Sequence, residues 1–159
     1  MSRDKTPSAQ ALSKRVSPGR PQPALTAEIE RCDGSAEAKA GLFLMNGDWK
    51  RAHEVAQELD SPTAAYWHAL VHRHEPDFDN SKYWLRRVGR HPVHAALAAA
   101  AKDDPEARSA MPKEQWDPIR FTDCYRDSGE SSWTRRIEAI ELRALLDYSL
   151  APPERGTSE

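Results

Sequence analysis

Residues 35–92 read SAEAKAGLFLMNGDWKRAHEVAQELDSPTAAYWHALVHRHEPDFDNSKYWLRRVGRHP, and this stretch decides the fold class. Its apolar residues recur at spacings of three and four, between turn signals such as Asn46-Gly47 and Asp60-Ser61-Pro62. The alternation of apolar and polar residues that is typical of strands is absent. The stretch therefore predicts antiparallel helical hairpins and an all-α fold.

Working outward, Gly and Pro residues divide the rest of the chain into further helical segments. Helices are expected at about residues 35–45, 48–59, 62–74, 80–88 and 93–102, with a short one at 106–111 and another from 117. A long C-terminal helix is expected at 131–150. Its apolar stripe should pack across the earlier hairpins and comprises Trp133, Ile137, Ile140, Ala144 and Tyr148, widened by Leu142, Leu145 and Leu146.

Both ends of the chain differ from this block in composition. Residues 1–25 are basic and rich in Pro and Ser, and residues 151–159 contain Pro152-Pro153 with no apolar residue after them. Such compositions bury too little apolar surface to offset the entropy of ordering. We expect two disordered tails around a single all-helical domain at residues 26–150.

Charge and hydropathy limit the partners and the compartment. The formal net charge is −2, but residues 1–24 hold five basic side chains and one acidic, which leaves −6 on the rest. An acidic body argues against nucleic acid as a partner. No apolar run is long enough to span a membrane, and Cys32 and Cys124 form no CxxC pair. We therefore expect a soluble, cytoplasmic protein.

The hairpins also show an internal quasi-repeat with a period of 29 residues. The residues that correspond in the two copies are Ala40 and Ala69, Gly47 and Pro76, Ala52 and Ser81, Ala56 and Leu85, and Leu59 and Val88. Small residues twelve positions apart, one on each helix of a hairpin, allow the two helices to approach closely.

This spacing resembles the tetratricopeptide repeat, which implies a peptide-binding groove. Tyr66, Leu70 and Arg73 match the groove positions of that family, and Lys102 matches Arg73 one period later. The resemblance implies a cationic clamp for an acidic protein segment. The alternative is an irregular helical bundle. Residues 66–92 also resemble small bacterial proteins of uncharacterised function, a family that implies no activity.

Histidine is concentrated in one part of the chain. Five of the six histidines fall within 27 residues: His68, His72, His74, His91 and His94. His68 and His72, four apart on a helix, can face one metal ion, with His91 or His94 as a third ligand. No HExxH, ExxH or CxxC pattern supports this site. The alternative is that these histidines are polar face residues or helix caps.

Cationic side chains form the second candidate site. Lys82, Arg86 and Arg90 recur every four residues, with Arg87 beside them, and Tyr83 and Trp84 are interleaved. Arginine suits carboxylate or phosphate, and the aromatic rings suit stacking. The alternative is a solvated charged face in which Trp84 belongs to the core.

These patterns lead to two functional hypotheses. The favoured one is a non-catalytic interaction domain that binds a protein segment or a small anion through the basic-aromatic face. No nucleophile elbow or phosphate loop is present, so no catalytic residue and no cofactor are assigned. The alternative is a small helical metalloprotein or metal-dependent hydrolase built on His68 and His72.

Overall fold

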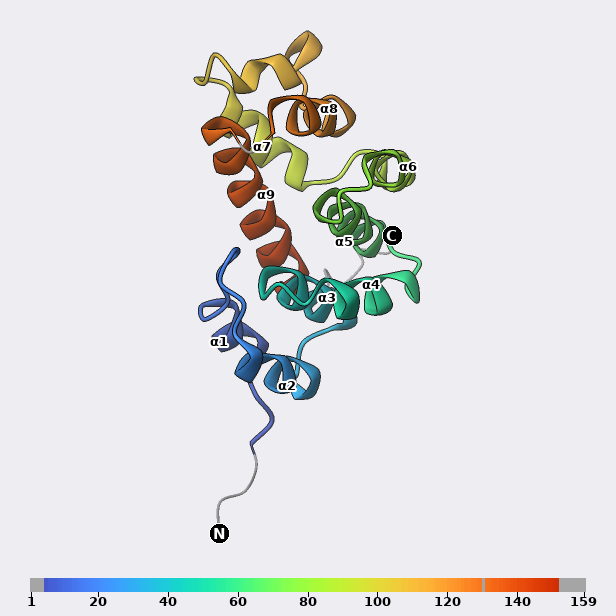
Figure 1. The fold of residues 1–159 in the computed structure, drawn as a ribbon, viewed down its shortest axis with the longest axis vertical. Coiled ribbons are helices and arrows are strands. Elements are labelled where there is room, and N and C mark those ends of the chain that lie inside the picture. Colours follow the sequence, from blue (N-terminus) through green and yellow to red (C-terminus); the bar gives the residue numbers. More distant parts are fainter. Residues whose placement is uncertain (1–4, 130, 152–159) are drawn as a thin grey trace, which may run out of the picture.

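The computed structural model describes residues 5–129 and 131–151, and these residues are helical without any strand. The prediction of an all-α fold with a long C-terminal helix is confirmed (Figure 1). The α-helices are α1 (Ala9–Ser13), α2 (Pro23–Arg31), α3 (Ala36–Met45), α4 (Trp49–Gln57), α5 (Pro62–His74), α6 (Phe78–Val88), α7 (Val93–Ala101), α8 (Pro118–Ser128) and α9 (Ser132–Leu150). Two short 3-10 helices, η1 (Ala107–Ala110) and η2 (Pro112–Glu114), lie before α8.

Local sequence signals set most of these helix ends. The hydroxyl oxygens of Ser35 and Ser61 accept the amide N–H of Ala38 and Ala64, each at 3.1 Å, and so cap α3 and α5. Asp117 caps α8 in the same way. Gly89, at a φ of 67°, ends α6 in the left-handed conformation that a residue with a Cβ rarely adopts.

Small residues bring the helices of each hairpin close together. Ala40 and Ala52 are both fully buried where α3 packs against α4. In the hairpin of α5 and α6, the hydroxyl of Ser81 donates to the carbonyl of Ala69 at 2.7 Å. The pair Ala69 and Ser81, twelve residues apart, therefore lies at a close approach of α5 and α6.

Helix α9 packs against α3 and α7, and Figure 1 shows it running between the two ends of the molecule. Its buried face includes Trp133, Ile137 and Leu145 but also Glu138 and Glu141. Leu142, Leu145 and Leu146 of the predicted stripe are buried, but the buried face is turned toward the two glutamates, and Tyr148 is 46% exposed. The reason is that the two carboxylates find a cationic partner inside the protein, which apolar periodicity does not reveal.

The N-terminal segment differs from the expected disordered tail over residues 1–25. Helices α1 and α2 pack on α3, with Leu12, Val16 and Leu25 buried. The side-chain oxygen of Asp33 accepts the amide N–H of Ala9 at 2.9 Å. A few apolar residues at helical spacing thus join the core despite the Pro-rich composition. Residues 1–4, and the predicted tail at 151–159 apart from residue 151, lie outside the described residues.

The sequence predicts that no segment is long and apolar enough to span a membrane. Within residues 5–129 and 131–151, no helix combines the length and the apolarity needed to cross a membrane.

Candidate functional site

Three histidines from two helices meet at one place. His68 and His72 share a face of α5, and α4, which packs against α5, adds His53. One ring nitrogen from each histidine lies within 4.8 Å of the others. The ring centroids are 4.6 to 5.3 Å apart, with His68 and His72 stacked and His53 edge-on to both. We call this group the histidine cluster.

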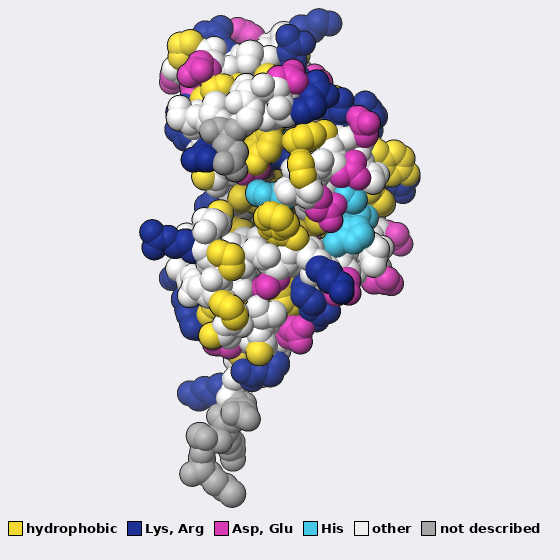
Figure 2. Space-filling view, viewed as in Figure 1, with side chains coloured by type: hydrophobic (Ala, Val, Ile, Leu, Met, Phe, Trp, Pro, Cys, Tyr) yellow, Lys and Arg dark blue, Asp and Glu magenta, His cyan; other side chains and the backbone are white. Residues whose placement is uncertain are grey.

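The cluster is largely shielded from solvent but reaches the surface. His68 and His72 are 5% and 8% exposed, and His53 is half-buried. Trp84 covers one side of the cluster by stacking on His68, with centroids 4.0 Å apart. Figure 2 shows histidine side chains gathered at one place on the surface, beside acidic side chains.

Burial keeps one member of the cluster in the form that binds metals. Desolvation lowers the pKa of His68 to about 4, and the neighbouring rings of His53 and His72 add to this effect. At neutral pH the His68 ring is therefore neutral and has a free nitrogen lone pair, which a metal ion requires.

The carboxylate of Glu75 orients the ring of His72. Nδ1 of His72 lies 2.8 Å from Oε1 of Glu75, one helical turn further along the chain. An ionised carboxylate only accepts hydrogen bonds, so the proton of the neutral ring resides on Nδ1 and the lone pair on Nε2. Carboxylate partners of this kind orient the histidine ligands of metal sites.

Sequence patterns alone missed His53. It lies on the helix before the predicted pair, and the i, i+4 rule compares residues of one helix only. A usable signal existed, because His53 and His68 lie at similar distances on either side of the turn at residues 58–61. Two helices of a hairpin bring such positions together.

The predicted third ligands, His91 and His94, lie elsewhere. They lie at the start of α7 and flank the ring of Tyr66, with ring centroids 5.3 and 5.6 Å from that ring. Nδ1 of His91 accepts the amide N–H of Val93 at 3.2 Å, and Nδ1 of His94 accepts that of His91 at 3.1 Å. Desolvation lowers the pKa of His94 to about 4. These two histidines support the backbone at the N-terminus of α7 and are not part of the cluster.

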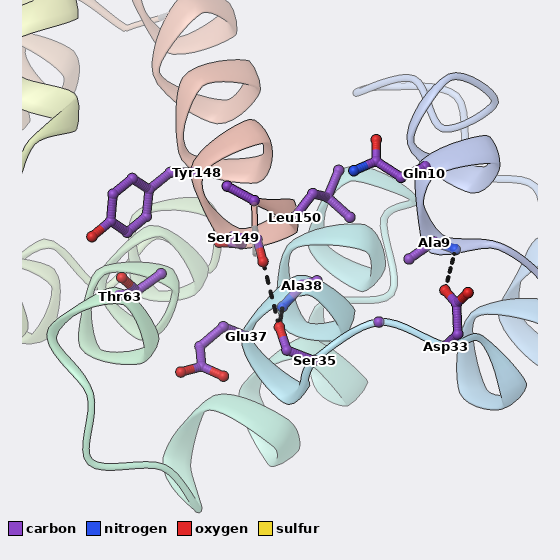
Figure 3. Close-up of a pocket in the computed structure, with 12 residues that line it drawn as sticks. Ala9, Gln10, Asp33, Ser35, Glu37, Ala38, Thr63, Tyr148, Ser149 and Leu150 are labelled. Carbon is purple, nitrogen blue, oxygen red and sulfur yellow. Dashed lines mark hydrogen bonds between the residues drawn. The ribbon is translucent and has the colours of Figure 1, made fainter. Parts of the chain in front are cut away.

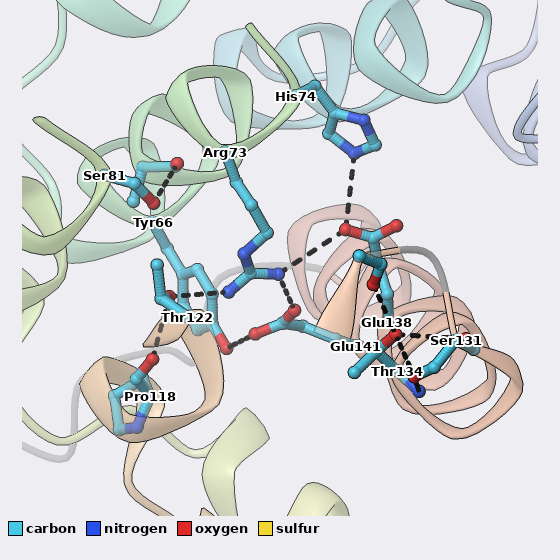
Figure 4. A network of polar contacts seen from close by, with 12 residues as sticks. Tyr66, Arg73, His74, Ser81, Pro118, Thr122, Ser131, Thr134, Glu138 and Glu141 are labelled. Carbon is cyan, nitrogen blue, oxygen red and sulfur yellow. Dashed lines mark hydrogen bonds and ion pairs between the residues drawn. The ribbon is translucent and has the colours of Figure 1, made fainter. Parts of the chain in front are cut away.

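The opposite side of α5 carries a buried ionic network (Figure 4). Arg73 is 1% exposed, and its Nη1 lies 2.6 Å from Oε1 of Glu141 and 3.6 Å from Oε2 of Glu138. The Tyr66 hydroxyl donates to Oε2 of Glu141 at 2.6 Å. The guanidinium also lies over the ring of Phe121, 5.0 Å from its centroid. We call this group the Arg73 network.

One carboxyl group of the network, that of Glu138, has a pKa near neutral pH. Burial raises the pKa of Glu138 to about 7, although Arg73 opposes this shift. Arg73 makes its short contact with Glu141 and the longer one with Glu138, and Nε2 of His74 also lies 3.5 Å from Oε2 of Glu138.

The network corrects the predicted peptide groove. Tyr66, Leu70 and Arg73 are fully buried and therefore do not line an open surface. The acidic partner that the cationic clamp was expected to bind lies in the same chain, as Glu138 and Glu141 of α9. Lys102, the second cation of the predicted clamp, is exposed at the end of α7 and does not join Arg73.

The cations of α6, and Arg90 just beyond its end, do not converge on one point either. Nζ of Lys82 pairs with Asp123 at 2.9 Å, and Nη1 of Arg90 donates to the carbonyl of Trp116 at 2.9 Å. Arg87 lies over the rings of Tyr83 and Trp84, and Arg86 is exposed. Three of the four cations are thus engaged with the protein itself, two through polar contacts and Arg87 through aromatic rings.

Comparison with known proteins adds no relative. Scans against family models, curated proteins and solved structures each found no match to this chain.

Proposed function

We propose that this protein binds a divalent metal ion such as zinc through His53, His68 and His72. The observation that carries the proposal is the convergence of three imidazole nitrogens within 4.8 Å. Ring nitrogens of histidine suit Zn²⁺, Cu²⁺ and Ni²⁺, whereas Mg²⁺ and Ca²⁺ require oxygen ligands.

The geometry needs a modest contraction to hold the ion. Zinc binds histidine nitrogen at about 2.0–2.1 Å, which places the nitrogens of a tetrahedral site roughly 3.4 Å apart. The three nitrogens, which lie within 4.8 Å of one another, therefore move closer by at most about 1.4 Å when the ion binds. Rotation of the rings supplies this movement without rebuilding α4 or α5.

The surroundings favour binding over catalysis. Three protein ligands leave a fourth tetrahedral position for water or another ligand, which is also the arrangement of hydrolytic zinc sites. A hydrolase needs a substrate pocket beside the ion as well. The described pockets, of about 890, 500 and 420 Å³, are lined by none of the three histidines. We therefore propose a metal-binding protein in which the ion links α4 to α5.

A tetratricopeptide-like interaction domain is the second candidate. It is supported by the close contact between Ser81 and Ala69 and by the exposed Arg86, Arg87 and Tyr83 on α6. The face of α6 is the surface on which a protein segment or small anion would bind in this proposal, because α9 covers the groove positions.

Zinc titration by isothermal calorimetry tests the proposal on metal-free, tag-free protein. We expect one ion per chain, and a loss of affinity of about 100-fold or more in His53→Gln, which removes one of three ligands. His91→Asn is the matched control, because Asn retains an acceptor for the amide N–H of Val93. An equal loss in both variants, or no binding by the wild-type protein, would contradict the proposal.

A further inference from the structure

A pocket at the other end of the hairpins has its own chemistry. It lies between α1, the start of α3, the start of α5 and the end of α9, and it has a volume of about 890 Å³. Ser35 joins two of its walls, since its hydroxyl lies 3.4 Å from the carbonyl oxygen of Ser149. Figure 3 shows Tyr148 and Thr63 on one side of the pocket, Ala9 and Gln10 on the other, and Glu37 between them. This volume lies in the range of small-molecule sites.

The charge of the lining has one sign. Two carboxylates, of Asp33 and Glu37, line the pocket, and none of its described lining residues is Lys, Arg or His. Glu37 is half-buried, and its Oε2 accepts the hydroxyl of Ser61 at 3.0 Å. Within the described part of the chain no cation pairs with it. A half-buried carboxylate without a counter-charge favours a cation more strongly than an exposed one does.

The remaining lining suits the organic part of such a cation. Tyr148 is 46% exposed, and its ring is held edge-on against His91 with centroids 4.7 Å apart. Aromatic rings attract ammonium and guanidinium groups. Leu150, Ala9 and Ala38 add apolar surface, and the hydroxyls of Thr63 and Ser149 add hydrogen-bonding groups.

We infer that this pocket binds a small organic cation, an amine or guanidinium compound with an aliphatic chain. The cationic group pairs with Glu37, Tyr148 attracts the same group through its ring, and the chain lies along Leu150 and Ala38. The site shares no residue with the histidine cluster, so it extends the function beyond metal binding.

Spermidine, a linear aliphatic triamine, is the probe for the first experiment. We expect calorimetry on the full chain to show saturable binding, weakened about 10-fold or more in Glu37→Gln, because a charge-assisted hydrogen bond is lost. Glu58→Gln is the matched control, since it removes the same charge from an exposed position outside the pocket. The resonances of Tyr148 and Leu150 should shift on titration.

Three outcomes would overturn the inference. One is the absence of saturable binding by the wild-type protein. Another is an equal loss of affinity in Glu37→Gln and Glu58→Gln, which indicates general attraction to an acidic surface. The third is a lower melting temperature of Glu37→Gln with unchanged affinity, which indicates that Glu37 only stabilises the N-terminus of α3. His53→Gln should bind spermidine normally, so failure of the metal proposal leaves this test intact.

Discussion

The two sides of α5 bury polar groups against different kinds of partner. On one side, the Arg73 network joins a cation to two acids and a tyrosine hydroxyl, so each group meets a complementary one. On the other side, the histidine cluster brings together three groups of the same kind. The first arrangement supplies its own counter-charges. The second places nitrogen lone pairs near one another and becomes complementary when a cation joins them.

This difference assigns the two sides different roles. The Arg73 network connects α5 to α8 and α9, and its loss should affect the folding of the whole chain. The histidine cluster connects only α4 and α5, near the surface, and its loss should affect metal affinity. The predictions below test whether stability and metal binding separate in this way.

The largest expected effect is on stability. Arg73→Ala leaves Glu141 buried without its cation, and breaking a buried pair from one side costs about 3–5 kcal/mol. Urea unfolding of the metal-free variant measures this loss. Arg86→Ala, on an exposed position of α6, should change the free energy of unfolding by less than about 0.5 kcal/mol. Similar values for the two variants would show that the network does not stabilise the fold.

The second effect concerns metal affinity alone. Glu75→Ala removes the carboxylate that orients the His72 ring, and such changes lower metal affinity about 10- to 100-fold. The free energy of unfolding of the metal-free protein should change little, because Glu75 is largely exposed. Zinc titration of Glu75→Ala beside Glu58→Ala makes the comparison. Unchanged affinity in Glu75→Ala would remove Glu75 from the site.

The smallest expected effect is a dependence of stability on pH that arises from Glu138 of the Arg73 network. The pKa of Glu138 is raised from its ordinary value of 4.5 to about 7, so its contribution to stability is present below pH 4.5 and is lost as pH rises through 7. Stability should therefore fall between about pH 4.5 and 7, by at most about 1.4 kcal/mol per pH unit for one proton, and this dependence should level off above pH 7.

Urea unfolding across this range compares the wild-type protein with Glu138→Gln. The wild-type protein should lose stability relative to the variant as pH rises through this range, because the variant has no proton to lose. His94, with its pKa lowered from 6.5 to about 4, acts in the opposite sense, because its contribution is lost as pH falls below 6.5. An equal slope in Glu138→Gln and wild-type protein between pH 4.5 and 7 would contradict the assignment to Glu138.

Local chemistry explains which parts of the structure the sequence predicted. The caps at Ser35, Ser61 and Asp117, and the end of α6 at Gly89, depend on residues within a few positions of one another. The spacing of His68 and His72 is local in the same sense. Each of these features was therefore readable from a short window.

Features that depend on distant contacts were not predicted. Arg73 was identified as a cation that needs an acidic partner, but its partner Glu141 lies 68 residues away in the chain. His53 joins the cluster only because α4 packs against α5. Leu12 and Val16 are buried because α3 is nearby, although the composition around them resembles that of disordered segments.

The most direct test of the metal-binding claim is the zinc K-edge X-ray absorption spectrum of the protein loaded with one equivalent of zinc. The structure predicts a four-coordinate ion with three imidazole nitrogens at about 2.0–2.1 Å and one further light atom, a pattern that should be lost in His53→Gln. A spectrum of six-coordinate hydrated zinc, or one that His53→Gln leaves unchanged, would show that the histidine cluster does not hold the ion.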